Sequence, residues 1–329
     1  TLAMIAAAVA GARAYSFAAY LLVSEAIATG LAWRASDWRP HHAPRWSSVR
    51  GLLKTGADVT GYQVLAHLTQ QIDAIIVGRF FGAYALGLYN RANQLLLLPQ
   101  LHVATPLNQV AMVTLSRIGC HSRDFIHHAR STATVVTHLV LPLFAVCIVL
   151  PQETVRLILG AQWPHAAPLL GVLAVAATAA TITSLAYAIN VAAGQTRRLV
   201  FSAAVALPLT AVAAWLGAQR GPIGVAENIA LVNVALVLPR LWWALRGLPE
   251  GLFGYARALL GPIVAAVVFS IGLWLGRSSV EESNWAVRLG VATGGGVLAL
   301  VLLAAVWPRL RKEWRLVAAS LPLPWSREK

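Results

Sequence analysis

The sequence predicts an all-α protein whose helices cross a membrane several times, and three observations support this fold class. Of its 329 residues, 58% are hydrophobic and 12% are charged, whereas a soluble domain carries about 25% charged residues. The mean hydropathy is +0.67. Long apolar runs recur without the short alternating segments of a transmembrane barrel. The spans are therefore expected to be helices, which satisfy their own backbone hydrogen bonds in lipid.

Apolar windows of about 20 residues, long enough to cross a bilayer as a helix, locate the spans in chain order. A partial span lies near 1–11, and the first full one, near 14–33, is interrupted at mid-depth by Glu25. The next span, near 55–78, is unusually polar, and the following one, near 84–115, contains basic and amide side chains close to its start. These two spans hold most of the candidate functional residues.

The later apolar runs are more uniform. The last one contains Gly294, Gly295 and Gly296, which predict close helix packing. Four prolines are expected to mark kinks or helix starts: Pro99, Pro106, Pro142 and Pro222. The later spans are predicted near 132–150, 166–192, 198–217, 222–245, 258–276 and 286–307. About nine to ten spans are therefore expected in the chain.

The net charge of +14 is distributed unevenly between the two sides of this predicted topology. Most basic residues fall in one set of loops and in the C-terminal tail, which the positive-inside rule assigns to the cytoplasm. These basic segments are 34–54, 117–130, 197–198, 240–257 and 309–329. We expect a multi-pass protein of the inner (plasma) membrane with a cytoplasmic C-terminus. No basic module is long enough to fold alone as a nucleic-acid-binding domain.

Motifs for enzymatic, metal or cofactor chemistry are missing from the sequence. Cys120 and Cys147 lie far apart and form no CxxC pair. Adjacent histidines at 41–42 and 127–128 fall in predicted basic loops and lack the spacing and carboxylate of an HExxH helix. No GxGxxG, Walker or GxSxG motif occurs. The sequence predicts neither an enzyme nor a protein that binds a metal or a cofactor.

One helix face of the span near 55–78 is polar along its length. Asp58, Tyr62, Thr69 and Asp73 follow one another at helical spacing, and Gln70 lies beside them. Such a face avoids lipid and lines either a water-filled cavity or a helix interface. For the Gln and Thr side chains both environments fit equally well. For Asp73 a cavity is favoured, because a buried carboxylate is costly to hide, although a pair with Arg79 is an alternative.

Two arginines flank the turn between this span and the next. For Arg79, which is near the predicted interface, snorkelling to the head groups explains the position as well as function does. Arg91 lies farther into its span beside Tyr89, Asn90 and Asn93. There a guanidinium can bind a phosphate through two hydrogen bonds. Glu25 is a candidate for carrying a coupling proton, or for a carboxyl neutralised by burial.

These residues carry a resemblance to a known family. The stretch QIDAIIVGRFFGAYALGLYNRANQLLLLP, the following PLNQVAMVTLSRI and the later LILGAQWPHAAPLL resemble polysaccharide flippases of the multidrug/oligosaccharidyl-lipid/polysaccharide exporter superfamily. The lipopolysaccharide and exopolysaccharide biosynthesis branch is the most similar. Asn90 stands where that family often has Ser. Its recurrent positions correspond here to Asp73, Gly78, Arg79, Gly82, Gly87, Leu88, Tyr89, Arg91, Ala92, Pro99, Pro106, Leu115, Ser116 and Arg117.

The resemblance implies a fold of two helical lobes around a central cationic cavity. Residues 1–33 would end the first lobe, and 34–54 would form a basic cytoplasmic linker. Residues 55–245 would be the complete second lobe of six helices. Residues 258–307 would be two additional C-terminal helices, followed by a basic tail, 308–329. The chain begins at Thr1 within an apolar run and without a signal peptide, so we expect that it lacks its N-terminal part.

The resemblance also implies a function, a substrate and partners. A cavity lined by Arg91, Arg79, Tyr89, Asn90, Asn93 and Gln70 would bind the pyrophosphate and sugars of a lipid-linked oligosaccharide. Its polyprenyl tail would stay in membrane lipid while the lobes rock between two access states. H⁺ or Na⁺ coupling would use Asp73, Asp58 or Glu25, and the polysaccharide biosynthesis machinery would supply the substrate. The alternatives are a cation-coupled multidrug exporter of the same fold or a membrane glycosyltransferase or polymerase.

Overall fold

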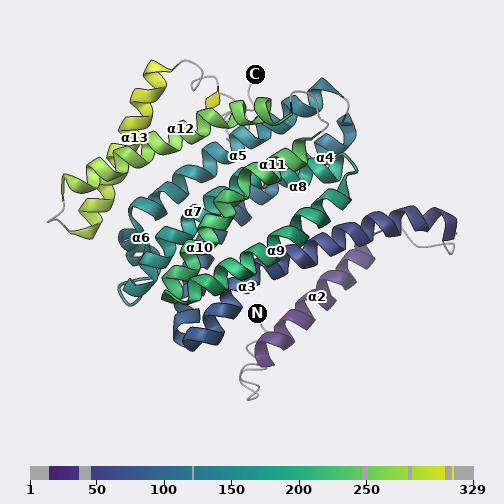
Figure 1. Cartoon of the computed structure of the whole chain (residues 1–329), viewed down its shortest axis with the longest axis horizontal. Coiled ribbons are helices and arrows are strands. Elements are labelled where there is room, and N and C mark those ends of the chain that lie inside the picture. Colours follow the sequence, from purple (N-terminus) through teal and green to yellow (C-terminus); the bar gives the residue numbers. More distant parts are fainter. Residues whose placement is uncertain are drawn as a thin grey trace. The chain divides into compact units, whose positions relative to one another are not determined.

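The structure is a computed structural model, and it describes residues 15–36, 46–120, 122–246, 251–280, 284–307 and 313–314. Its regular elements within these ranges are all helices (Figure 1). Among the described residues, seven helical stretches are long and apolar enough to cross a membrane, and one of them, Gly56–Ile118, bends sharply inside. The prediction of an all-α, multi-span membrane protein is confirmed. The predicted partial span near 1–11, His41 and His42 lie outside the described residues.

The chain divides into two compact units, Thr1–Leu53 and Lys54–Lys329. Within the first unit the structure describes α2 (Tyr15–Ala35), which corresponds to the predicted span near 14–33. Glu25 is an exposed side chain of this helix. The second unit holds the remaining spans and is described below by itself. The predicted lobe boundaries remain a prediction.

Helix α3 (Trp46–Pro99) contains two of the predicted spans and a sharp bend between them. At Gly82 the backbone has φ 80° and ψ −178°, a conformation that is essentially restricted to glycine. Beyond Pro99 the chain forms a π-helical turn, η1 (Gln100–Ala104), and continues as α4 (Thr105–Ile118). Pro106 cannot donate a backbone hydrogen bond, and the Thr105 hydroxyl donates to the Gln100 carbonyl over 2.9 Å. The widened turn therefore keeps the helix continuous past the prolines.

Helix α5 (Arg123–Val149) begins nine residues earlier than the predicted start at 132. The hydroxyl of Ser122 accepts a hydrogen bond from the Asp124 N–H over 3.1 Å, and this N-cap allows the helix to start in a polar segment. The loop assignment of His127 and His128 was therefore wrong, since both lie in the first turns of α5. The hydropathy window missed these turns because it responds to apolar residues and not to caps.

The later spans agree with the predicted positions, but two of them are interrupted. The predicted span near 166–192 forms α7 and α8, which meet at Ser184, and the predicted span near 222–245 forms α10 and α11, which meet at Leu236. The later elements are α6 (Pro151–Ile158), η2 (Pro164–Ala166), α7 (Ala167–Thr183), α8 (Leu185–Ala192), α9 (Thr196–Ala218), α10 (Gly221–Ala235), α11 (Val237–Leu245), α12 (Gly251–Ser278) and α13 (Trp285–Val306).

Helices of the second unit pack most closely where glycines lie at their crossing points. Helix α9 meets α10 where a Cβ atom on Gly217 would overlap the Gly224 carbonyl, and α12 meets α13 where a Cβ atom on Gly272 would lie 2.6 Å from the Gly295 carbonyl oxygen. Helix α12 also lies along α5 (Figure 1). Lipid provides no hydrophobic drive between helices, so close backbone approach supplies much of the association energy. The prediction of close packing thus holds for Gly295 and Gly296, whereas Gly294 has open space around it.

Candidate functional site

The second unit encloses a polar cavity of about 440 Å³. Side chains from α3, η1, α7, α8, α9, α10 and α11 line it, so it is formed between helices of the second unit. Such a volume is typical of small-molecule sites, which range over roughly 300–1,000 Å³. The polar and charged lining residues are Tyr62, Thr69, Gln70, Gln71, Asp73, Asn93, Gln100, Thr183, Ser184, Tyr187, Asn190, Arg198, Ser202, Thr210, Asn233, Arg240 and Trp243.

The polar face predicted for residues 55–78 contributes one wall of this cavity. Tyr62 stacks on Tyr187 of α8 with ring centroids 5.3 Å apart, and the Gln63 amide donates to the Tyr187 hydroxyl over 3.4 Å. Thr69 and Gln70 are lining residues one to two turns farther along. The polar face of α3 therefore lines the cavity and also contacts a neighbouring helix, α8.

Asp73 lines the cavity but is also the partner of a residue beyond the bend in α3. Its Oδ2 accepts a hydrogen bond of 2.7 Å from the hydroxyl of Tyr89, and its Oδ1 accepts one of 2.8 Å from the Ala74 N–H. Asp73 is 7% exposed and Tyr89 is fully buried. This bond joins the two arms of α3 across Gly82. Among the described residues no ion pair links Asp73 to Arg79, so the alternative pairing is not formed.

Two arginines in the cavity wall supply its positive charge. Arg240 of α11 is half-buried, and its Nη1 donates to Oδ1 of Asn233 over 3.4 Å. Arg198 of α9 donates through Nη1 to the Arg246 carbonyl over 2.8 Å and also to Gln195. Because a guanidinium has five N–H donors, these bonds leave donors for a ligand. Asp73 is the one carboxylate among the described lining residues, so the cavity carries a net positive charge.

Sequence reasoning missed both cavity arginines because it counted them with the charges of cytoplasmic loops. Arg240 lies inside α11, and Arg198 lies in the first turn of α9. The signal was present for Arg240, since the predicted span of 222–245 already included it. An arginine inside an apolar span is by default a candidate for function.

Six of the nine predicted site residues can be divided by whether they line the cavity. Gln70, Asp73 and Asn93 line the cavity, whereas Arg79, Asn90 and Arg91 are exposed side chains that do not contribute to its wall. The Arg91 guanidinium lies 5.6 Å above the ring of Trp163 and donates to Gln94 over 3.0 Å.

The remaining two acidic candidates lie elsewhere in the chain. Asp58 is half-buried near the start of the second unit, where its Oδ2 accepts a hydrogen bond of 3.2 Å from the Thr196 hydroxyl. Glu25 belongs to the first unit. The structure therefore gathers three of the nine predicted residues at the cavity, with Tyr89 directly behind Asp73.

The fold is similar to that of a solved transporter. A solved structure described as lipid II flippase MurJ in an inward closed conformation matches with a TM-score of 0.61 at 16% identity, over 75% of this chain and 52% of that one. At this identity the likeness establishes the fold alone. The family model for polysaccharide biosynthesis proteins matches residues 1–168. The chain belongs to this polysaccharide biosynthesis protein family. The family resemblance predicted from the sequence is thereby confirmed.

Two curated proteins whose names refer to polysaccharide biosynthesis align along most of the chain. The teichuronic acid biosynthesis protein TuaB of Bacillus subtilis is 24% identical over 281 residues, which are 84% of this chain and 58% of that protein. The succinoglycan biosynthesis transport protein ExoT of Rhizobium meliloti is 23% identical over 314 residues, which are 94% of this chain and 63% of that protein. The chain thus spans about three fifths of the length of these relatives.

Proposed function

We propose that this chain functions in a flippase that moves lipid-linked oligosaccharides from the cytoplasmic to the outer leaflet of the inner membrane. The substrate would be a polyprenyl-pyrophosphate-linked repeat unit for a cell-surface polysaccharide. Membership of the polysaccharide biosynthesis protein family, a relative named as a succinoglycan transport protein and a flippase-like fold support this proposal. The transport cycle would be alternating access, with the C-terminus on the cytoplasmic side.

The observation that carries the proposal is the chemistry of the cavity. Arg198 and Arg240 line the cavity together with the amides of Asn93, Asn190 and Asn233. Guanidinium groups bind phosphate oxygens through two parallel hydrogen bonds, and amides and stacked tyrosines suit sugar hydroxyls and ring faces. A pyrophosphate cannot cross hydrocarbon without such partners, because an unpaired charge there costs several kcal/mol. The cavity would hold the head group while the lipid tail stays in the membrane.

The charge balance also discriminates between the two transporter functions. A cavity for cationic drugs requires carboxylates and aromatic faces, whereas the described lining holds two arginines and one carboxylate. That carboxylate, Asp73, already accepts two hydrogen bonds. An anionic head group is therefore the better match to the cavity than a cationic drug.

Ion coupling would use the same carboxylates that the sequence predicted. Asp73 is positioned to couple its own protonation or cation binding to the bend in α3, because Tyr89 on the far side of Gly82 donates to it. Asp58 would act through α9, because its hydrogen-bond partner Thr196 is the first residue of this helix, which also carries Arg198. Arg91 and Arg79, exposed outside the cavity wall near the outer turn of the predicted topology, would attract the anionic head group as it leaves the cavity.

Complementation tests this function. The protein would be expressed in a strain lacking its own flippase, and surface polysaccharide would be scored for Arg240→Ala, Arg240→Lys and Arg198→Ala variants. We expect Arg240→Ala and Arg198→Ala to lower surface polysaccharide at least tenfold at equal protein level, with partial activity for Arg240→Lys. Arg220→Ala is the matched control, since Arg220 is exposed and outside the cavity wall. Normal polysaccharide in all variants would refute the cavity assignment.

A further inference from the structure

Two of the apolar core clusters of the second unit follow each other along the same helices. One cluster contains Phe125 and Ala133 of α5, and the other begins at Val136 of the same helix. The chain passes between the same two clusters from Ala177 of α7 to Leu185 of α8. The cluster with Phe125 lies at helix ends that the predicted topology places on the cytoplasmic side. We therefore call it the inner cluster and the other one the outer cluster.

The inner cluster joins helix segments that pack against one another. Helix α8 contacts both α4 and α11, and α12 contacts α5 and α11. We call this group of segments the inner half. Its members are α4, residues 123–133 of α5, α8, α11 and residues 251–259 of α12. The inner half is a body with an apolar core of its own.

Prolines interrupt three of these helices where they leave the inner half. Pro106 directly follows the π-helical turn η1 at the start of α4, and Pro239 lies in the first turn of α11, after the junction with α10. Pro262 of α12 lies between Leu259 of the inner cluster and Ala265 of a third cluster. A proline cannot donate to the carbonyl four residues earlier, so a helix bends there.

Hydroxyl groups mark the same level at the junction of α7 and α8. Thr181 and Thr183 donate to carbonyls of the preceding turn over 2.9 and 3.3 Å, and such bonds often bend a helix. Ser184, which joins the two helices, accepts a hydrogen bond of 3.0 Å from the Asn108 amide of α4. Oδ1 of Asn108 is buried and has no hydrogen-bond partner among the described residues, which makes this arrangement less stable than one that satisfies it. The junction can therefore rearrange at low cost.

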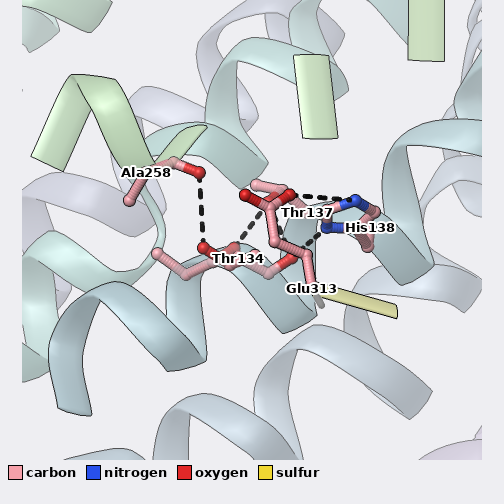
Figure 2. Close-up of polar contacts among 6 residues, drawn as sticks. Thr134, Thr137, His138, Ala258 and Glu313 are labelled. Atoms are coloured by element: carbon pink, nitrogen blue, oxygen red, sulfur yellow. Dashed lines mark hydrogen bonds and ion pairs between the residues drawn. The ribbon is translucent and has the colours of Figure 1, made fainter. Parts of the chain in front are cut away.

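The contact between α5 and α12 holds a similar layer of hydroxyl groups (Figure 2). The Thr137 hydroxyl donates to the Ala133 carbonyl of its own helix over 2.5 Å. The Thr134 hydroxyl donates to the Ala258 carbonyl of α12 over 3.4 Å. This carbonyl is the one that Pro262 leaves without its backbone donor. A polar layer therefore separates the inner cluster from the apolar clusters beyond it.

The cavity extends across this layer. Tyr187 and Arg240 line it from the inner half, whereas Ala177 and Ile229 line it from the outer cluster. A displacement of the inner half therefore changes the distance between two parts of the cavity wall. It also moves the Arg240 guanidinium relative to the part that stays in place.

We propose that the inner half turns as one body about the polar layer and so widens and narrows the cavity. A continuous helix resists bending because its backbone hydrogen bonds would break, whereas at these positions the bonds are already missing or shared with side chains. The motion positions Tyr187 and Arg240 for a ligand, and it depends on the fold and not on the identity of the substrate. The positions where the five stretches bend form the hinge plane: Pro106, Thr137, Ser184, Pro239 and Pro262.

Distances between spin labels test this motion in the whole chain in lipid nanodiscs, after both cysteines are replaced by alanine. Labels would replace exposed side chains, Val113 and Phe253 in the inner half and Leu231 and Trp274 outside it. For the pair of Val113 and Leu231, which spans the hinge plane, we expect a distance distribution about twice as wide as for either pair on one side of it. Equal widths for all three pairs would overturn the proposal. No substrate enters this test, so its outcome is independent of the proposed function.

Restoring the backbone donors should stiffen the hinge plane. In the Pro239→Ala, Pro262→Ala double variant, the distribution across the hinge plane should narrow to the width of the other two, because alanine donates the bond that proline cannot. Pro142→Ala is the matched control and should leave the width unchanged, since Val140 and Phe144 of the outer cluster flank this proline inside α5. Size-exclusion profiles establish that each variant is folded. An unchanged width in the double variant, or equal narrowing in Pro142→Ala, would contradict the hinge plane.

Discussion

Replacing Tyr89 by Phe removes the hydroxyl that joins the two arms of α3. The oxygen–oxygen distance is 2.7 Å, and Tyr89 is fully buried, so a phenylalanine ring at this position leaves no hydroxyl to donate to Asp73. Hydrogen bonds to charged groups contribute about 1.5–3 kcal/mol in soluble proteins. Double-mutant cycles within membranes average about 0.6 and reach about 1.7 kcal/mol. We expect a coupling energy of about 1.5 kcal/mol for this pair.

The assay is a double-mutant cycle on the free energy of unfolding, measured by steric trapping in bicelles. Tyr89→Phe should destabilise the protein by roughly 1.5–3 kcal/mol, because the Asp73 carboxylate loses a donor. The same change should cost much less in an Asp73→Asn background, where the acceptor carries no charge. Tyr84→Phe is the matched control on the same helix, since that ring is exposed. Equal effects of Tyr89→Phe and Tyr84→Phe on the free energy of unfolding would refute a stabilising role for the hydrogen bond between Tyr89 and Asp73.

Three further predictions concern backbone geometry and a surface contact. Gly82→Ala should destabilise the protein by roughly 1–3 kcal/mol because the side chain is strained at φ 80°, and unchanged unfolding would contradict this bend. Gly217→Ala should cost about 1–3 kcal/mol through overlap with the Gly224 backbone, measured in the same unfolding assay. Trp163→Leu should lower stability by roughly 1–3 kcal/mol, because the half-buried ring packs against the core as well as under Arg91 and leucine fills only part of its space; unchanged unfolding would contradict this.

The helices themselves follow from local information in the sequence. A run of about 20 apolar residues must form a helix in lipid because its backbone has no other hydrogen-bond partner. The bend at Gly82 and the π-helical turn before Pro106 also have local causes, a positive φ and a missing N–H. The start of α5 at Arg123 was missed, although its cause, the Ser122 cap, is local too. It depends on hydrogen bonding and not on hydropathy.

Whether an individual polar residue lines the cavity depends on tertiary contacts. Arg91 and Arg240 are both arginines within apolar runs, and hydropathy alone cannot separate them. Arg91 lies over the ring of Trp163 outside the cavity wall, whereas Arg240 lines the cavity and donates to Asn233. Asp73 was predicted to be a cavity residue, and it is one, but its partner Tyr89 is 16 residues away beyond the bend.

The sequence by itself determined the membrane environment, the helical fold class, the family and one polar face of the cavity. These depend on composition, on helical periodicity and on local motifs. Only the tertiary structure decided which charges share the cavity, because α3 must pack against the later helices α7 to α11 before that space exists.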